Sequence, residues 1–328
     1  MDKLTNKNNV TLSLAVWLGT DTYDHDPDPK IISATSLLKP IRAIVLARQN
    51  KDLIKIGDVT GLIPSRMGTA YHDSIESSWN GPQFREVLLK LGYSEAIIDR
   101  VRINPKPEEV TGNIIPVYME LRGKKACGDF IISGKFDFCA EGNLEDFKST
   151  SVWSYIFGSN NSDYIYQGSI YRWLHPEIIT GDKITIQYIF TDWSASKAKQ
   201  DRAYPQSRIL SKTFPLMSIA ETDAFIKGRL KAISSLLGAP QEQLPLCTPD
   251  ELWQKEAVWK YYKDPDKRVR STKNFTNPTE AHTRCATDGG TGIVVEVPGE
   301  VVRCRYCDVV GICSQAENLV NQKLLNLE

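Results

Sequence analysis

Two short apolar runs separated by a turn constrain the fold of this chain more than any other stretch. The runs cover residues 130–138 and 144–150, and the segment between them contains Gly142 and Asn143, which are typical of tight turns. The pattern predicts a β-hairpin. Because neighbouring side chains on a strand point to opposite faces, Asp146 and Lys148 should share one face while Phe147 points into a core.

Asp137 lies near the end of the first run and is expected beside Asp146 across the hairpin. Two carboxylates and an amine on one side of a sheet form a site for a hard divalent cation, with the amine of Lys148 left for chemistry. An Asp-x-Lys pattern also occurs by chance on solvated strand faces. The metal-site hypothesis therefore depends on which other residues lie in register.

The overall composition is that of an ordinary globular protein. A length of 328 residues predicts about two domains, and 40 Lys+Arg against 40 Asp+Glu give no net charge, so a nucleic-acid partner would need a local basic groove. No apolar run reaches membrane-spanning length, and residues 1–7 lack the apolar core of a signal peptide. We expect a cytoplasmic protein (host cytoplasm if phage-encoded) without a membrane partner, whose cysteines are free or metal-bound rather than disulfide-paired.

A predicted helix at 65–79 carries Gly68, His72 and Glu76 at four-residue spacing, which places them on one stripe. A helical His is more often a satisfied polar residue than a metal ligand, but imidazole is a common ligand and Glu76 lies on the same side. His72 is therefore a candidate ligand.

A second predicted helix, at 163–174, presents Tyr164, Gln167 and Tyr171 on one face. Uncharged polar groups can hydrogen-bond a phosphate or a base edge beside a metal. The alternative is a half-buried amphipathic helix with no ligand.

The remaining patterns predict a helix at 84–102, strands at 114–121 and 183–190, and a capping box at Ser218 and Glu221 that starts a helix running to about residue 237. Lys197, Lys199 and Arg202 follow the last strand and either track a nucleic-acid backbone or are solvated. The fold class is mixed α/β, with a small central mixed sheet flanked by helices.

The C-terminal region carries a compact group of thiols. Three cysteines in a C-x-x-C-x5-C pattern predict a metal site in a cytosolic chain. They are Cys304, Cys307 and Cys313, and a fourth ligand would be Cys247 or Cys285. Zinc and an iron–sulfur cluster both accept four cysteines, and the spacing does not choose between them.

Four signals occur in one order: Gly68-x3-His72-x3-Glu76, Asp137, Asp146-Phe147-Lys148 and Tyr164-x2-Gln167-x3-Tyr171. Over residues 31–193 this arrangement resembles the PD-(D/E)XK nucleases, particularly the RecB-like exonuclease branch. The C-terminal cysteines look like the iron–sulfur staple of AddB-type and CRISPR-adaptation nucleases, and their surroundings look like the tail of phage-encoded members. The chain departs from the pattern in having Phe136 where the family name has Pro, and no cysteine before Cys127.

The resemblance implies a restriction-endonuclease-like core. It divides the chain into a nuclease domain with an N-terminal helical extension at 1–240, and a cysteine-cluster segment packed on it at 241–328. His72, Asp137, Asp146 and the backbone carbonyl of Phe147 would hold one or two Mg²⁺ or Mn²⁺ ions.

The resemblance also implies that Lys148 would orient or deprotonate the attacking water, and that its pKa would be lowered by partial burial beside the metal ion. Gln167 and Tyr171 would position the substrate strand, and Glu76 would support the metal through water. A four-iron–four-sulfur cluster, or alternatively a structural zinc ion, would be bound by Cys247, Cys304, Cys307 and Cys313.

The implied activity is that of a DNA exonuclease that leaves 5′-phosphates, in phage recombination, replication or DNA degradation. The partner would be DNA with a free end. Because the chain has no G-x-x-x-x-G-K-[ST] loop, a helicase or recombinase would be another chain; a ring-shaped oligomer would suit processive action. The alternatives are a restriction-like endonuclease and a catalytically silent DNA-binding or assembly module.

Overall fold

The computed structural model describes residues 3–52 and 56–327, and the chain divides into two compact units. The first unit contains Met1–Leu38 and Ile54–Lys231, and the second contains Lys39–Leu53 and Ala232–Glu328. Helix α10 (Ile219–Leu236) begins in the first unit and ends in the second. Of the helices in the described part of the chain, none is both long and apolar enough to span a membrane.

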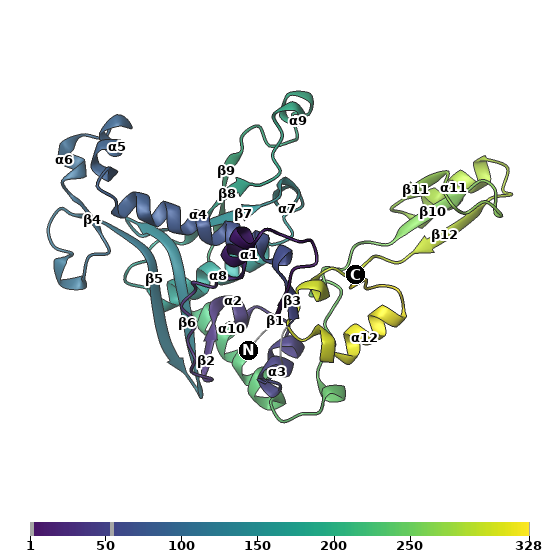
Figure 1. The fold of residues 1–328 in the computed structure, drawn as a ribbon, viewed down its shortest axis with the longest axis horizontal. Coiled ribbons are helices and arrows are strands. Elements are labelled where there is room, and N and C mark those ends of the chain that lie inside the picture. The colour runs from purple at the N-terminus through teal and green to yellow at the C-terminus, as the bar shows by residue number, and fades with distance from the viewer. Residues whose placement is uncertain (1–2, 53–55, 328) are drawn as a thin grey trace. The chain divides into compact units, whose positions relative to one another are not determined.

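A mixed, seven-stranded sheet forms the centre of the first unit (Figure 1). Six strands follow in the order β4 (Val101–Ile103), β5 (Ile115–Cys127), β6 (Phe130–Ala140), β7 (Asn143–Thr150), β8 (Lys183–Phe190) and β9 (Ile209–Pro215), and β2 (Ile31–Ser33) pairs with β6. The β4–β5, β7–β8 and β2–β6 pairs are parallel, and the others are antiparallel. The mixed α/β class is confirmed, and the sheet is larger than the small one expected because two short strands, β2 and β4, and the longer β9 join it.

The predicted hairpin is confirmed as β6 and β7. Its loop residues Glu141 and Gly142 have φ values of 49° and 79°, as a two-residue type I′ turn requires. A Cβ on Gly142 would lie 2.1 Å from Thr180 Oγ1, so only glycine fits at this position.

The β6–β7 ladder is short. It runs from Ala140↔Asn143 to Phe138↔Glu145, while the earlier part of β6 pairs with β2 over Ile131–Ser133. The two strands therefore separate where Asp137 and Asp146 stand. We call this point the β6–β7 fork.

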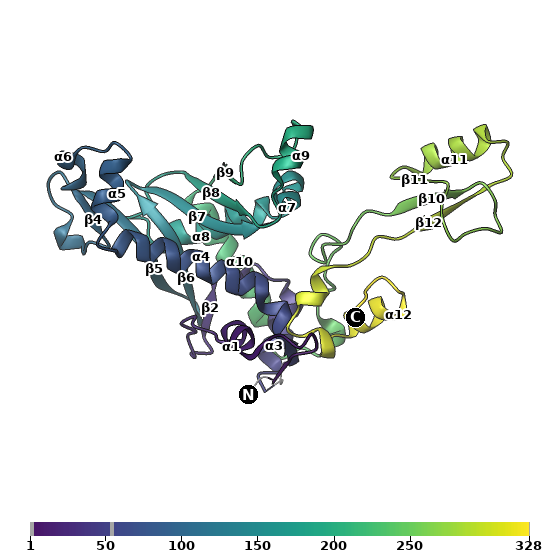
Figure 2. The ribbon, with the colours of Figure 1, turned by 45° about the horizontal axis from the view of Figure 1, so that its top comes forward.

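Helices α4 (Ile63–Asn80) and α8 (Asn161–Leu174) lie on opposite faces of the sheet at β7. Trp79 of α4 and Phe147 pack against the same apolar cluster, whereas Lys148 Nζ lies 5.8 Å from the ring centre of Tyr164 in α8. Adjacent strand residues point to opposite faces, so the two helices must cover different sides. Figure 2 shows α4 lying across the sheet.

Two glycines allow α8 to approach the sheet closely. A Cβ on Gly134 of β6 would lie 2.8 Å from Leu174 Cδ1, and one on Gly168 of α8 would lie 2.8 Å from Ile184 Cδ1. Real side chains do not tolerate such contacts, so larger residues at either position would push the helix outward.

The other elements of the first unit are short. The predicted helix at 84–102 is wrong: α5 (Phe84–Lys90) ends before Gly92, whose φ is 92°, and α6 (Glu95–Ile98) and β4 follow. The Ser218–Glu221 capping box is confirmed by its reciprocal hydrogen bonds at the start of α10. The remaining elements are β1 (Lys3–Thr5) paired with β3 (Ile56–Asp58), α1 (Leu12–Gly19), α2 (Ala34–Leu37), α7 (Val152–Phe157) and α9 (Ala195–Gln200).

The second unit combines α3 (Ile41–Gln49) with the C-terminal part of the chain. Strands β10 (Val258–Tyr262), β11 (Lys273–Phe275) and β12 (Ile293–Val297) form an antiparallel sheet in the order β11-β10-β12, and α11 (Pro278–Thr287) packs on it through Ala281. Helix α12 (Ser314–Asn321) follows. Two further small cores contain Val45, Leu46, Leu244 and Val309, and Leu252, Val301, Ala316 and Leu325.

Candidate metal centre at the β6–β7 fork

The side chain of Asp137 closes the end of the β6–β7 ladder. Its Oδ2 accepts a hydrogen bond of 2.7 Å from the backbone N–H of Phe147. This carboxylate takes the place of the strand carbonyl that would have been the acceptor had the ladder continued. The separation of the two strands therefore leaves room for the Asp137 side chain in the fork, where it is buried.

Asp146 and Lys148 share one face of β7, as expected. Lys148 Nζ forms an ion pair with Asp146 Oδ2 at 2.6 Å. Asp146 is 1% exposed, and its other oxygen, Oδ1, has no hydrogen-bond partner among the described residues. A buried carboxylate in this state needs a further cation or donor.

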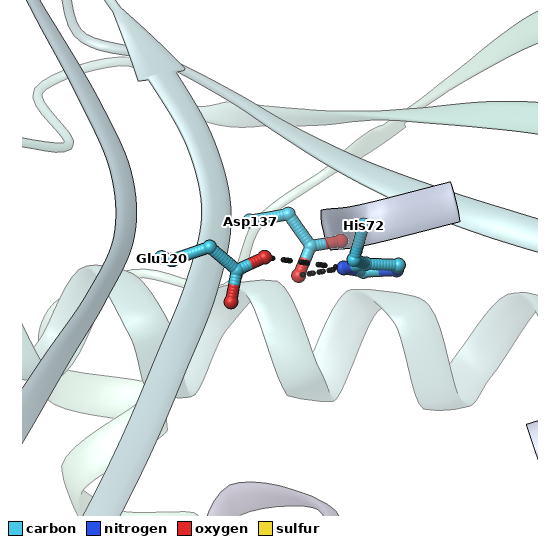
Figure 3. Close-up of side chains that lie close together, drawn as sticks. All are labelled: His72, Glu120 and Asp137. Carbon is cyan, nitrogen blue, oxygen red and sulfur yellow. Dashed lines mark hydrogen bonds and ion pairs between the residues drawn. The ribbon is translucent and has the colours of Figure 1, made fainter. Parts of the chain in front are cut away.

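His72 and Glu120 complete the centre, as Figure 3 shows. His72 Nδ1 lies 3.2 Å from Glu120 Oε1 and 3.6 Å from Asp137 Oδ1, and its Nε2 lies 3.2 Å from the carbonyl oxygen of Phe147. One donor atom from each of His72, Glu120 and Asp137 falls within 4.8 Å of the other two, so this group can hold a metal ion.

The electrostatics of the centre favour binding of a cation. Burial, and after it the charge of Asp146, raises the pKa of Asp137 to about 7. Burial alone would lower the pKa of His72, but its hydrogen bond to Glu120 and the charge of Asp137 raise it to about 9. In the metal-free protein the acids of the centre are balanced by the protons on His72, Lys135 and Lys148. The proton held by His72 would be released when a metal binds.

The pKa of Lys148 was expected to be lowered beside a bound cation, whereas in the protein without metal it is raised. Burial by itself would lower it, but the charges of Asp146 and Asp137 outweigh burial and hold the pKa of Lys148 above its usual range. Two carboxylates within reach of one ammonium group favour its charged form more than the apolar surroundings disfavour it.

Helix α8 contributes two of the predicted residues. Gln167 Nε2 donates a hydrogen bond of 2.6 Å to Tyr171 Oη, and both side chains are buried. Burial, followed by the charges of Asp146 and Asp137, raises the pKa of Tyr171 well above its usual value, which shows that its hydroxyl lies near both carboxylates. The structure thus brings Gln167 and Tyr171 to the fork.

Glu120 is the residue that sequence reasoning missed. It has a φ of 49°, in the left-handed region that is strained for a non-glycine residue and often found at functional sites. Its second oxygen pairs with Lys135. Its position in the strand before Asp137 is the signal that could have found it. Glu76, by contrast, is half-buried, with no hydrogen bond or ion pair to these groups across residues 3–52 and 56–327.

The four cysteines expected to bind a cofactor lie in one region of the second unit, but among the described residues no three of their sulfur atoms lie within 4.8 Å of one another. Successive turns at Cys304, Cys307 and Val310 lead to Cys313. Gln315 holds Cys247 beside them, because its Oε1 accepts from Cys247 N at 2.8 Å and its Nε2 donates to Cys247 O at 2.9 Å. Cys285 lies elsewhere, against the core of the β10–β12 sheet, with its Sγ 3.3 Å from Gly292 O.

The four thiols are half-buried and lie between two small cores. Burial, and after it the charge of Glu251, raises the pKa of Cys247 to about 12, and Cys313 and Cys304 are near enough to add to this shift. Buried Arg42 donates from Nε to Cys313 Sγ at 3.3 Å. A cation that donates to sulfur favours the thiolate form that a metal requires.

No family model and no curated protein matches the chain. Among solved structures, the crystal structure of SSO0001 is similar over 72% of this chain and 94% of its own, with a TM-score of 0.41 and 15% identity. A phage related exonuclease from Haemophilus somnus 129PT is similar over 36% of this chain and 62% of its own, with a TM-score of 0.23 and 14% identity. At these TM-scores neither similarity bears on the function of this chain. The function is therefore argued from the residues at the β6–β7 fork.

Proposed function

We propose that the chain is a metal-dependent deoxyribonuclease that hydrolyses phosphodiester bonds of DNA, as an exonuclease on free ends. The observation that supports this most is the pair of buried carboxylates, Asp137 and Asp146, with Lys148 paired to Asp146 Oδ2 and Asp146 Oδ1 lacking a hydrogen-bond partner in the described chain. Such a donor set fits Mg²⁺ or Mn²⁺, which prefer oxygen ligands.

The metal ligands proposed here are Asp137, Asp146, His72 and the Phe147 carbonyl, with Glu120 added from the structure. A bound divalent ion polarises a phosphoryl oxygen and lowers the pKa of a water molecule. Glu120 is held between His72 and Lys135, so it also orients the imidazole toward the fork.

Lys148 and the α8 pair would act on the substrate directly. An ammonium group held in its charged form is suited to donating hydrogen bonds to a phosphate oxygen and to orienting the attacking water. Tyr171, which already accepts from Gln167, has its own hydroxyl proton available to position the strand.

The test is degradation of end-labelled linear DNA, with a closed circular control, in Mg²⁺ or Mn²⁺. We expect wild type to degrade linear DNA, and Asp146→Ala and Lys148→Ala to lose at least about a hundredfold in rate, the usual effect of removing a catalytic electrostatic group. Asp182→Ala and Lys183→Ala remove the same side-chain types from an exposed site on the first unit and should retain activity.

Each outcome selects one function. Loss of linear DNA alone supports the exonuclease, and products with 5′-phosphates agree with it. Cleavage of circles would establish a restriction-like endonuclease instead. A wild type that binds DNA but cleaves neither form in either metal would overturn the nuclease proposal in favour of a silent binding or assembly module.

We also propose that Cys247, Cys304, Cys307 and Cys313 hold a structural four-iron–four-sulfur cluster, with zinc as the alternative. The chemistry of the donor set supports it: the four thiols pack against two adjoining small cores that share Cys313, and a guanidinium donates to the Cys313 sulfur. Visible absorbance and metal analysis of anaerobically purified protein distinguish the two cofactors.

A further inference from the structure

Helix α7 follows directly on β7, the strand that carries Asp146 and Lys148. Its inner side is firmly held: Val152 is fully buried and donates from its backbone N–H to Asp192 Oδ1 at 2.7 Å, and the Tyr155 ring packs edge-on against Tyr188 and Phe190. The Ser151 side chain caps its first turn. This short helix is therefore a rigid support for whatever it displays on its outer side.

The outer side displays two stacked aromatic rings. Trp153 is 48% exposed and Phe157 is 74% exposed, and their ring centroids lie 5.9 Å apart at an interplanar angle of 21°. The i,i+4 spacing brings them side by side on one face. Exposed rings of this size, grouped and held in place, are typical of a binding surface rather than of a solvated face.

One lysine lies close to these rings, and the segment that carries it is basic. Lys197 of α9 places its Nζ 5.8 Å from the Trp153 ring centre, and residues 191–212 contain five Lys or Arg but two Asp. Both carboxylates accept hydrogen bonds from the backbone: Asp192 from the N–H of Val152 and Asp201 from the N–H of Ala203. The surroundings of the rings are therefore positively charged, which fits a polyanion and disfavours a purely apolar partner.

The surface continues from the candidate active site. Trp153 lies five residues after Lys148 in the chain, so at ~3.3 Å per extended residue its Cα is at most about 17 Å from that of Lys148. Figure 2 shows α7 and α9 near each other at the end of β7 and β8. A strand of DNA that enters the fork can therefore reach the rings within a few nucleotides.

We propose that Trp153 and Phe157 stack on unpaired bases of single-stranded DNA and hold the strand end whose phosphodiester lies at the fork. The inference rests on the proposed nuclease function. Aromatic stacking beside cations that follow the backbone is the common mode of binding for single strands, and it tolerates any sequence because every base has a π-face. The consequence is a preference for substrates with single-stranded ends.

The test compares a fluorescein-labelled oligothymidylate with an abasic oligomer of equal length, bound to the full chain in EDTA so that no cleavage occurs. Trp153→Ala/Phe157→Ala should weaken oligothymidylate binding roughly 10- to 100-fold and leave abasic binding unchanged. Trp17→Ala/Tyr93→Ala removes two other exposed rings of the first unit and should change neither.

Salt titration separates stacking from charge. The aromatic double variant should keep the wild-type slope of log affinity against log salt, whereas Lys197→Gln/Lys199→Gln should make it shallower. Equal loss of oligothymidylate and abasic binding, or no loss of either, would overturn the proposal and point to a structural or protein-docking role for the rings.

A second readout keeps this inference apart from the proposed function. Bis(4-nitrophenyl) phosphate contains no nucleobase, so its hydrolysis in Mn²⁺ depends on the residues of the fork and not on stacking. Wild type and the aromatic double variant should therefore hydrolyse it equally. If wild type does not hydrolyse the ester but still binds oligothymidylate more tightly than the abasic oligomer, the nuclease proposal fails and the stacking site stands. If wild type hydrolyses the ester but the variant binds oligothymidylate normally, only the stacking site fails.

Discussion

At the scale of single residues, Asp137 links the fold to the chemistry. Its Oδ2 replaces a ladder acceptor at the fork, and burial beside Asp146 raises its pKa to about 7. The folded protein without metal therefore contains a carboxylate that resists ionisation. A residue that is unfavourable in the metal-free state and useful with a cation is typical of a functional site rather than of a stabilising core.

Asp137→Asn should make stability less dependent on pH. In wild type the unfolded chain ionises near 3.8 and the folded one near 7, so folding stability falls as pH rises from about 4 to 7 and then stays level. Asn does not titrate, and its Oδ1 still accepts from Phe147. In EDTA the melting temperature of the variant minus that of wild type should increase as the pH rises from about 4 to 7. If this difference instead decreased with rising pH, the raised pKa of Asp137 would be contradicted.

Stabilisation by metal should grow with pH. Binding must displace the proton of His72, whose pKa is raised to about 9, and that of Asp137. The shift in melting temperature on adding Mn²⁺ should therefore increase from pH 6 to pH 9. His72→Gln removes most of this dependence, and a shift that is equal at all pH values would argue against His72 as a ligand.

Residue-level prediction succeeded where strand alternation decided the outcome. Alternation is enough to put Asp146 and Lys148 on one face, and the structure confirms it. It says nothing of Glu120, because the contact depends on the register between β5 and β6, in which Met119↔Phe138 and Leu121↔Phe136 place Glu120 opposite Asp137. The raised pKa of Lys148 in the metal-free protein depends on how closely two carboxylates approach, and that distance is a tertiary property.

At the scale of elements, the distance between α8 and the sheet sets the position of Gln167 and Tyr171. Gly134 and Gly168 permit this short distance. The same two glycines therefore control how far the Tyr171 hydroxyl lies from the carboxylates of the fork.

Gly134→Ala should destabilise the protein by about 1–3 kcal/mol, the usual effect of overpacking, because the new Cβ would lie 2.8 Å from Leu174 Cδ1 and 3.0 Å from the Tyr171 ring. Nuclease activity should fall as well, since α8 must move. Gly228→Ala in α10, where nothing lies within 4 Å of the new Cβ, should instead stabilise by about 0.5–1 kcal/mol. Urea unfolding measures both, and equal effects would refute the close approach.

Sequence patterns located elements well where turn chemistry and periodicity agreed. The β6–β7 hairpin, α8, β8 and the capped start of α10 lie where they were predicted. The helix at 84–102 failed because its apolar spacing continues through Gly92, where the backbone turns. Short strands such as β2 and β4 carry too few residues for a period of two, so their pairing emerges only from the assembled sheet.

At the scale of the whole molecule, the second unit is assembled from two distant segments of chain. Val45 and Leu46 of α3 share one core with Leu244 and Val309, and no sequence pattern indicates that residues 39–53 belong there. Cys313 contacts this core and also the core of Leu252 and Val301. A metal bound at the four thiols would tie the two cores together.

Cys247→Ser should lose the bound metal and lower the thermal stability of the second unit, since a structural metal contributes directly to folding. Cys285→Ser is the matched control: its thiol lies against a different core, and metal content should stay at the wild-type level. Metal analysis with calorimetry on both variants provides the measurement. Loss of metal in Cys285→Ser with retention in Cys247→Ser would reverse the ligand assignment.

The divided second unit also has a consequence during synthesis. Val309 is 264 residues further along the chain than Val45, so at roughly 5–20 residues per second α3 emerges about 13–53 s before its core can close. Until Val309 emerges, the second unit can cover the apolar surface of α3 only in part, through Leu236, Ala239 and Leu244, and the rest is open to chaperones or to aggregation. Premature termination before Val309 would therefore release a chain in which this core is incomplete.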